Sequence, residues 1–231
     1  MGSIYVVRHG QAAFGTHEYD RLTDVGFMQA RLLGAHFGAR RIRFDAIFTG
    51  TLRRQIETAQ GILEGHPELG VNLVQERFAG LDEYLSEAIM TAHFGTAPVW
   101  SAGAEKRDPA LVRDHFRKLR EALLAWADAR TEPTGMMAFS RFQTEAVAAL
   151  VAARSRFPEG RVLIVSSGGP IAAIVASALQ SPPSTAIELN LRIRNSSLSE
   201  FSSGPKRHHL VSFNAVPHLD THPDAALITY A

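Results

Sequence analysis

Cysteine is absent from the sequence. Its absence excludes disulfide bonds, thiolate nucleophiles and zinc sites built on thiolates. The sequence also lacks an uninterrupted apolar run long enough to span a membrane. A strand-like segment begins within the first four residues, where a signal peptide would carry its charged region. We therefore expect a cytoplasmic protein with no membrane partner.

A surplus of charge of one sign is also lacking. The 24 lysines and arginines nearly balance the 23 aspartates and glutamates, which leaves a formal charge of +1. The basic run at 40–44 is short and suits the solvated end of a helix. Without a basic stripe, nucleic acid and anionic lipid are not expected partners.

Segments typical of strands and of helices alternate along most of the 231 residues. Strands are expected at 3–8, 44–50, 71–78 and 161–167. Helices are expected after Thr23, which can cap one, and at 51–65, 140–155 and 168–180. This alternation predicts an α/β fold of three layers, in which helices cover both faces of a mostly parallel sheet. We expect one domain spanning residues 1–231.

The middle of the chain departs from this alternation. Residues 82–95 are weakly helical, and residues 95–108 predict a loop because glycine, proline, alanine and serine recur without periodicity. A strong amphipathic helix follows at 108–130, and its apolar side carries Leu111, His115, Leu119 and either Ala122 or Leu123. We expect residues 82–155 to form a helical insertion, or lid, over one end of the sheet.

The last third, residues 186–216, is expected to form two strands around a Gly-Pro turn. His208 and His209 fall near that turn and are expected to be solvated. The sequence shows no internal repeat and no low-complexity tract.

Arg8 and His9 stand where the first apolar strand stops. Ligands of open α/β sheets bind beyond the carboxyl ends of the strands. Gly10 lets the backbone turn there, the arginine offers a planar fork of donors for phosphate, and the histidine can serve as a nucleophile. The alternative is an arginine in a buried ion pair beside a histidine bonded to backbone.

Two further strand ends carry groups that suit an anion. Arg53 and Arg54 open the helix after the second strand, where positive charge is unfavourable unless an anion offsets it. We expect Arg53 to pair with Glu57 or to be solvated, and Arg54 to bind the anion. The Ser-Gly-Gly turn at 167–169 offers further donors, although it also suits an ordinary strand-to-helix turn.

Taken together, these segments resemble the histidine phosphatase superfamily, which has the phosphoglycerate-mutase-like fold. The similarity covers most of the chain and follows the family order. The matching segments are "VVRHGQ" at 6–11, "LTDVGFMQARLLG" at 22–34, "TLRRQIETA" at 51–59, "GLDEY" at 80–84, "VLIVSSGGPIAAI" at 162–174 and "RNSSLSEF" at 194–201.

The resemblance implies a mechanism without metal or cofactor. His9 attacks a phosphomonoester and forms a phosphohistidine, while Arg8 and Arg54 clamp the phosphoryl oxygens. A carboxylic acid protonates the leaving oxygen, and water then hydrolyses the intermediate. The expected substrate is a small phosphorylated molecule or a phosphoprotein, and Gln11 is expected to contact the substrate or the hydrolytic water.

Two glutamates are candidates for the acid. Glu83 follows Leu81 and Asp82 in the leucine-x-glutamate context of the family, so we prefer it. Glu76 is the alternative, although it can equally pair with Arg77 at the end of a strand. Asp82 ranks third. A useful acid needs a raised pKa.

The sequence departs from the family pattern at Ser167, which stands where the family commonly has a second histidine. With Gly168, Ser167 is still expected to bind phosphate, but it carries no positive charge. A lost charge-assisted hydrogen bond costs roughly 1.5–3 kcal/mol, or about 10- to 150-fold in rate. His218 is our first candidate to replace the missing histidine, followed by His17 and His93.

Three functions compete. A metal-independent phosphatase ranks first. A phosphoglycerate mutase ranks second, because the segments after the first motif and around the acid match the mutases poorly. A binding protein that keeps the clamp without turnover ranks third, and Ser167 is its main support. A homodimer is the commonest assembly among soluble oligomers and is a possible state here, but no sequence feature singles it out.

Overall fold

The computed structural model describes residues 2–13, 20–70, 73–96, 109–204 and 207–230. Six strands form one sheet in the order β3-β2-β4-β1-β5-β6. Their bounds are β1 Gly2–Arg8, β2 Ala46–Thr49, β3 Val74–Arg77, β4 Arg161–Ser166, β5 Leu198–Ser203 and β6 His208–Ala215. The first four in this order run parallel, while β5 and β6 are antiparallel to their neighbours. The predicted mostly parallel sheet is confirmed.

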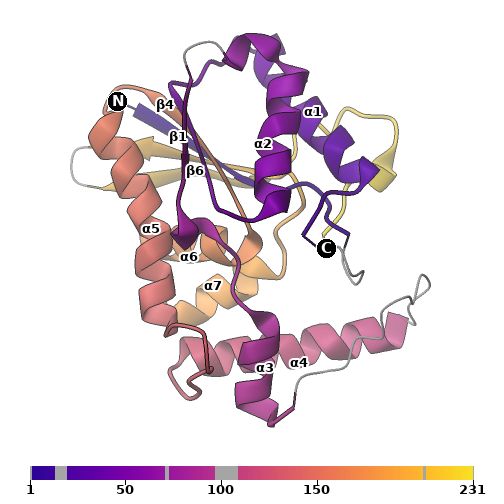
Figure 1. Cartoon of the computed structure of the whole chain (residues 1–231), viewed down its shortest axis with the longest axis vertical. Helices are drawn as coiled ribbons and strands as arrows, with labels where there is room; N and C mark the ends of the chain where they lie inside the picture. The colour runs from indigo at the N-terminus through magenta and orange to yellow at the C-terminus, as the bar shows by residue number, and fades with distance from the viewer. Residues whose placement is uncertain (1, 14–19, 71–72, 97–108, 205–206, 231) are drawn as a thin grey trace.

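Alternating residues of β1 belong to two different cores. Ile4 and Val6 pack on one face of the sheet, whereas Tyr5 and Val7 pack on the other. A strand that is apolar on both faces must be covered twice. Figure 1 shows α1 (Asp24–Ala39) and α2 (Arg53–Gly65) on one side of the sheet, and α5 (Phe139–Arg156) and α6 (Gly168–Ala178) on the other. The three-layer α/β prediction is therefore confirmed.

Local sequence signals explain how α1 and α2 pack. Thr23 caps α1, and its side chain accepts a hydrogen bond from the Gly26 N–H at 3.1 Å, as predicted. A Cβ atom at Gly34 would lie 2.1 Å from the Ile62 carbonyl oxygen, so only glycine lets the two helices approach this closely. This packing fixes the N-terminus of α2 at the carboxyl end of the sheet.

Three helices lie beyond that end of the sheet: α3 (Ser86–Phe94), α4 (Pro109–Ala127) and α7 (Pro183–Asn190). Helix α4 packs against α3 and α7, and Figure 1 shows α3 and α4 facing the lower end of α2 across the molecule. Helix α5 instead packs on α6 and the sheet. That residues 82–155 form one insertion stays a prediction, and the part of it facing the strand ends is α3 with α4.

Two predicted features differ from the structure. Residues 183–190 form α7, whereas strands were expected from residue 186; Pro183 suits the first helical turn, and the alternating apolar residues misled the prediction. Leu111 is 67% exposed, because the first turn of α4 extends past the elements that bury His115 and Leu119. Most of the loop predicted at 95–108 lies outside the described residues.

None of the helices in the described part of the chain combines the length and the apolarity needed to cross a membrane.

Candidate active site

His9 directly follows β1 at the carboxyl end of the parallel strands. Its backbone N–H donates to the Ser166 carbonyl oxygen at 2.9 Å, and its own carbonyl accepts from the Ser196 N–H at 3.1 Å. The ring Nδ1 lies 2.7 Å from the Gly10 carbonyl oxygen. Because a carbonyl oxygen can only accept, Nδ1 carries the proton and Nε2 keeps its lone pair. The ring is therefore held in the tautomer that a nucleophile at Nε2 requires.

The surroundings of His9 favour the neutral ring. The side chain is buried, and this burial lowers the pKa of His9 well below its ordinary value. The positive charges of Arg54 and Arg8 lower the pKa further, while the hydrogen bond with the Gly10 carbonyl opposes them. The lowered pKa therefore favours an uncharged His9 ring at neutral pH.

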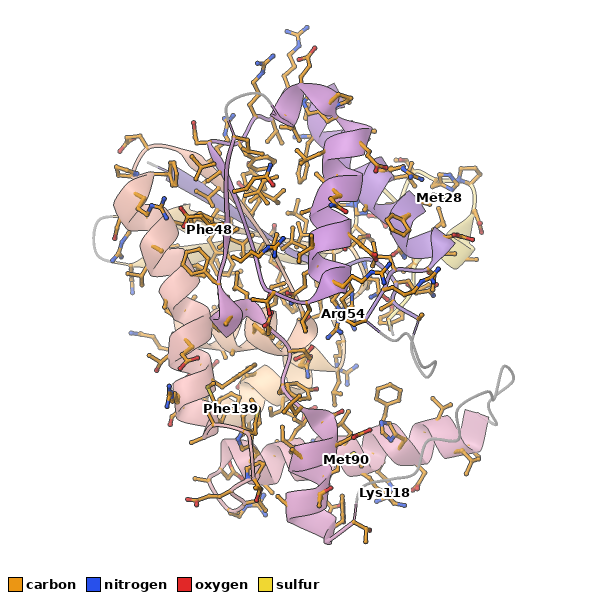
Figure 2. The ribbon with its side chains drawn as sticks, in the orientation of Figure 1. Met28, Phe48, Arg54, Met90, Lys118 and Phe139 are labelled. Atoms are coloured by element: carbon orange, nitrogen blue, oxygen red, sulfur yellow. The ribbon has the colours of Figure 1, made fainter. Side chains whose placement is uncertain are left out.

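Arg8 and Arg54 reach the site from different elements. The guanidinium of Arg8 donates to the carbonyl oxygens of Ile193 and Tyr230, which fixes its direction. The side chain of Arg54 is only 5% exposed, and its Nη1 lies 2.9 Å from Oδ1 of Asp20. Figure 2 shows Arg54 at the lower end of α2, on the side that faces α3 and α4.

Asp20 explains why two arginines are tolerated at the start of α2. Its carboxylate accepts from the backbone N–H groups of Arg53 at 2.9 Å and Arg54 at 3.4 Å. An anion at a helix N-terminus is favourable, and here a side chain of the chain itself supplies it. Arg53 points outward at 60% exposure and pairs with Glu57 at 2.6 Å, as the sequence analysis expected.

Glu83 is half-buried beside the N-terminus of α6. Its carboxylate accepts from the Gly169 N–H, with oxygens at 3.1 and 3.2 Å, and from the Tyr84 N–H at 3.2 Å. A Cβ atom at Gly169 would lie 2.2 Å from this carboxylate and 2.7 Å from the Tyr84 ring, so a larger residue there would displace these side chains. Burial raises the pKa of Glu83, while Arg54, these N–H groups and Arg8 oppose the rise.

The two other candidate acids lie elsewhere. Glu76 on β3 forms an ion pair with Arg156, not with Arg77, and its pKa is lowered. Asp82 accepts from the backbone N–H of Thr51 at 2.6 Å and from the Thr51 hydroxyl. Of the three, Glu83 is the carboxyl group that the structure places beside His9 and the two arginines.

One cavity of about 550 Å³ is lined by Arg8, His9, Arg54 and Glu83 together. Its described lining comprises Arg8, His9, Ala12, Arg54, Glu83, Tyr84, Ser86, His115, Phe116, Leu119, Asn190, Leu191, Asn195 and Tyr230. A separate open hollow along α1 contains no nucleophile next to a cation. Paired guanidinium groups, a neutral imidazole and a carboxylic acid with a raised pKa are suited to phosphoryl transfer. In the described part of the chain, no cluster of histidine and carboxylate side chains suits a metal ion.

Four other predicted site residues are absent from the described lining. The buried hydroxyl of Ser167 accepts a hydrogen bond from Gln55 Nε2 at 2.9 Å, and Gly168 begins α6. Gln11 accepts from the Thr23 hydroxyl at 2.8 Å through its side-chain oxygen. His218 contacts the Ser196 hydroxyl at 2.8 Å. Their roles in binding phosphate or substrate stay predictions.

The two further histidines considered as replacements lie apart from the cavity or cannot be placed. His93 lies on α3, 3.3 Å from Glu121 of α4. His17 falls outside the described residues. His115 lines the cavity instead, although its place on the apolar side of α4 suggested a core residue.

Asp20, Asn195 and Tyr230 were not predicted as site residues. Asp20 lies 34 positions from its partner Arg54, so no local pattern signals the contact. Asn195 belongs to the matched segment at 194–201, which was a usable signal. Tyr230 reaches the cavity from the other end of the chain, and nothing near it in the sequence indicates this.

Comparisons with known proteins identify the family of the chain. A model of the histidine phosphatase superfamily (branch 1) matches residues 4–216. A 2,3-bisphosphoglycerate-dependent phosphoglycerate mutase from Methylobacterium sp. (strain 4-46) is 40% identical over 75 residues, or 29% of this chain. That match spans only 36% of the length of the curated relative.

Several solved structures share the fold. A phosphoserine phosphatase variant from Entamoeba histolytica, in complex with phosphoserine, has a TM-score of 0.65 at 18% identity, covering 95% of this chain and 100% of that one. A mycobacterial glucosyl-3-phosphoglycerate phosphatase has a TM-score of 0.62 at 24% identity, covering 92% and 98%. With its sequence matched from the first strand to the last, this chain belongs to the histidine phosphatase superfamily.

Proposed function

We propose that this chain is a metal-independent phosphomonoester hydrolase that works through a phosphohistidine on His9. The carrying observation is that His9, Arg8, Arg54 and Glu83 line a single cavity. Membership of the family supports phosphoryl transfer in general. The identity of the four groups and their protonation states support the hydrolytic route.

In the first step, the two guanidinium groups bind the phosphoryl oxygens. Nε2 of His9 attacks phosphorus, and the P–N bond forms as the bond from phosphorus to the ester oxygen breaks. Glu83 gives its proton to the departing oxygen. The raised pKa of Glu83 favours the protonated acid that this transfer needs, and a bound phosphate dianion would raise it further.

In the second step, water attacks the phosphohistidine. Glu83, now a carboxylate, takes a proton from the water, and the P–N electron pair returns to Nε2. Inorganic phosphate leaves. His9 then regains the neutral tautomer that the Gly10 carbonyl holds in place.

Ser167 limits the charge available to this site. The Gln55 amide donates to its hydroxyl at 2.9 Å, and the described cavity wall does not include it. The two arginines therefore supply the fixed positive charge on the described part of the wall. This arrangement is expected to slow phosphoryl transfer without abolishing it.

The deciding experiment incubates the pure protein with p-nitrophenyl phosphate and a panel of natural phosphomonoesters in EDTA, beside a His9→Ala variant. We expect phosphate release that survives chelation and disappears in the variant. Interconversion of 2- and 3-phosphoglycerate that outpaces phosphate release would assign a mutase instead. Binding of vanadate without turnover of any ester would assign a binding protein.

A further inference from the structure

The cavity has two chemically different halves. One half holds the clamp, the nucleophile and the acid. The other half includes an apolar set formed by Phe116 and Leu119 of α4, Leu191 beyond α7, and Tyr84, beside polar side chains that include Ser86, His115, Asn190 and Asn195. This apolar set is the far wall. A phosphoryl group held by the clamp leaves the far wall to contact the alcohol portion of the ester.

The two rings of the far wall, Phe116 and Tyr84, are held in defined orientations by neighbouring side chains. The rings of His115 and Phe116 lie 5.5 Å apart at 81°, edge to face. The Tyr84 hydroxyl accepts from Asn190 Nδ2 at 2.8 Å, and its ring lies 6.0 Å from Trp126. Fixed rings bind an apolar group with little further loss of side-chain entropy.

Charge on the cavity wall argues against an acidic alcohol portion. Among the lining residues that the structure describes, Arg8 and Arg54 are the only lysines or arginines. Both are directed toward the phosphoryl position, one by backbone carbonyls and the other by Asp20. A carboxylate in the substrate, as a second anionic group beside the phosphoryl group, would need a cation of its own.

We propose that the substrate is a phosphomonoester whose alcohol portion is uncharged and carries an apolar or aromatic ring that packs against Phe116 and Leu119. This inference rests on the proposed hydrolase function of the same cavity. It distinguishes the chain from an enzyme for phosphorylated carboxylic acids such as phosphoserine or phosphoglycerate.

The first test compares four esters that all release an alkoxide, so that leaving-group chemistry does not dominate. They are benzyl phosphate, glycerol 3-phosphate, O-phospho-L-serine and 3-phosphoglycerate. We expect kcat/KM for benzyl phosphate to exceed that for each carboxylated ester by about tenfold or more. Faster turnover of either carboxylated ester would overturn the proposal.

The second test truncates the far wall. Phe116→Ala is expected to lower kcat/KM for benzyl phosphate about tenfold and to leave glycerol 3-phosphate within about twofold. Leu111→Ala, in the exposed first turn of the same helix, is the matched control and should change neither value. An equal loss on both esters in Phe116→Ala would show a structural role only and would contradict the proposal.

A binding measurement separates this inference from the proposed function. Calorimetry would compare benzylphosphonate with 3-phosphonopropionate, neither of which can be hydrolysed. If no ester is turned over, the hydrolase function fails; tighter binding of benzylphosphonate that Phe116→Ala weakens would still uphold the far wall. Equal binding of the two phosphonates, or tighter binding of the carboxylated one, would reject it.

Discussion

At the scale of single residues, His9 and Glu83 are shifted in opposite directions by the same burial. Desolvation penalises the charged form of each group, so the imidazole loses its proton more readily and the carboxyl keeps its proton longer. Two groups whose pKa values move toward each other in this way are suited to nucleophile and acid at one pH.

The acid assignment predicts a dependence on the leaving group. Glu83→Gln cannot donate a proton, so kcat/KM for an alkyl phosphate should fall about 10²- to 10⁴-fold. p-Nitrophenolate leaves without protonation, so p-nitrophenyl phosphate should be affected far less. Initial rates on both esters check this. Glu76→Gln, which removes only a carboxylate of a surface ion pair, should behave as wild type; a loss there matching Glu83→Gln would reassign the acid.

The same shifts predict an acidic pH optimum. Because the pKa of His9 is lowered, the ring stays neutral at pH values below 6.5, the ordinary pKa of histidine. Because the pKa of Glu83 is raised, the carboxyl group stays protonated at pH values above 4.5, the ordinary pKa of glutamate. The pH profile of kcat/KM on an alkyl phosphate should therefore decline on the alkaline side, and Glu83→Gln should abolish this decline. An unchanged alkaline limb in the variant would assign it to another group.

Replacement of Ser167 is predicted to increase activity instead of lowering it. Ser167→His adds the imidazole of the family pattern, and we expect kcat on a good substrate to rise about tenfold or more from the added charge-assisted bond. The site is fully buried, so thermal unfolding of the variant must confirm that the larger ring fits. A well-folded variant without any gain would show that another residue already supplies the role.

At the scale of elements, α2 depends on a carboxylate that lies outside the helix. Asp20 accepts from two N–H groups of its first turn and binds the Arg54 guanidinium at 2.9 Å. Residue Leu52, at the capping position itself, makes no side-chain cap. The helix end and the Arg54 guanidinium are therefore held by one side chain.

Removing that carboxylate should cost stability as well as activity. Asp20→Ala is expected to lower the free energy of unfolding by about 0.5–2 kcal/mol, the usual range for a lost helix cap. Urea denaturation measures this, and the exposed Asp220→Ala serves as the control. Inhibition by vanadate should weaken in Asp20→Ala alone. Unchanged stability together with unchanged inhibition would remove Asp20 from both roles.

At the scale of the whole molecule, the layers of the fold could be predicted because their signals are local. Thr23 indicates the start of α1, and the apolar run at 162–165 indicates a strand buried on both faces. That Arg8, His9 and Arg54 lie close together was predictable because strand ends meet at one edge of a sheet. The contributions of Asn190 on α7 and of Tyr230 to the cavity were not, since they arise from contacts that no periodicity encodes.

Buried histidines tie global stability to pH. Burial, with a smaller effect of His36, lowers the pKa of His218 to about 3, and burial lowers that of His208 to about 4. As the pH falls below 6.5, these two histidines bind protons in the unfolded chain but not in the folded chain. The free energy of unfolding therefore decreases as the pH approaches the lowered pKa values.

Replacement of His218 should flatten this dependence. Between pH 6 and 4, the slope of the free energy of unfolding against pH should fall in His218→Gln by up to about 1.4 kcal/mol per pH unit, the value for one proton. Urea titrations at several pH values give the slope. His222→Gln, on a surface turn, should keep the wild-type slope; equal slopes in all three proteins would refute the assignment.

The central position of β1 has a consequence for how the chain is made. β1 pairs with β4 through Ser3 and Arg161, and with β5 through Gly2 and Ser203. The long stretch of chain between β1 and β4 must therefore be synthesised before β1 finds either neighbour. Nascent chains stalled before β4 are expected to expose an apolar strand that needs chaperone protection, and His9 takes its place only after β4 has been made.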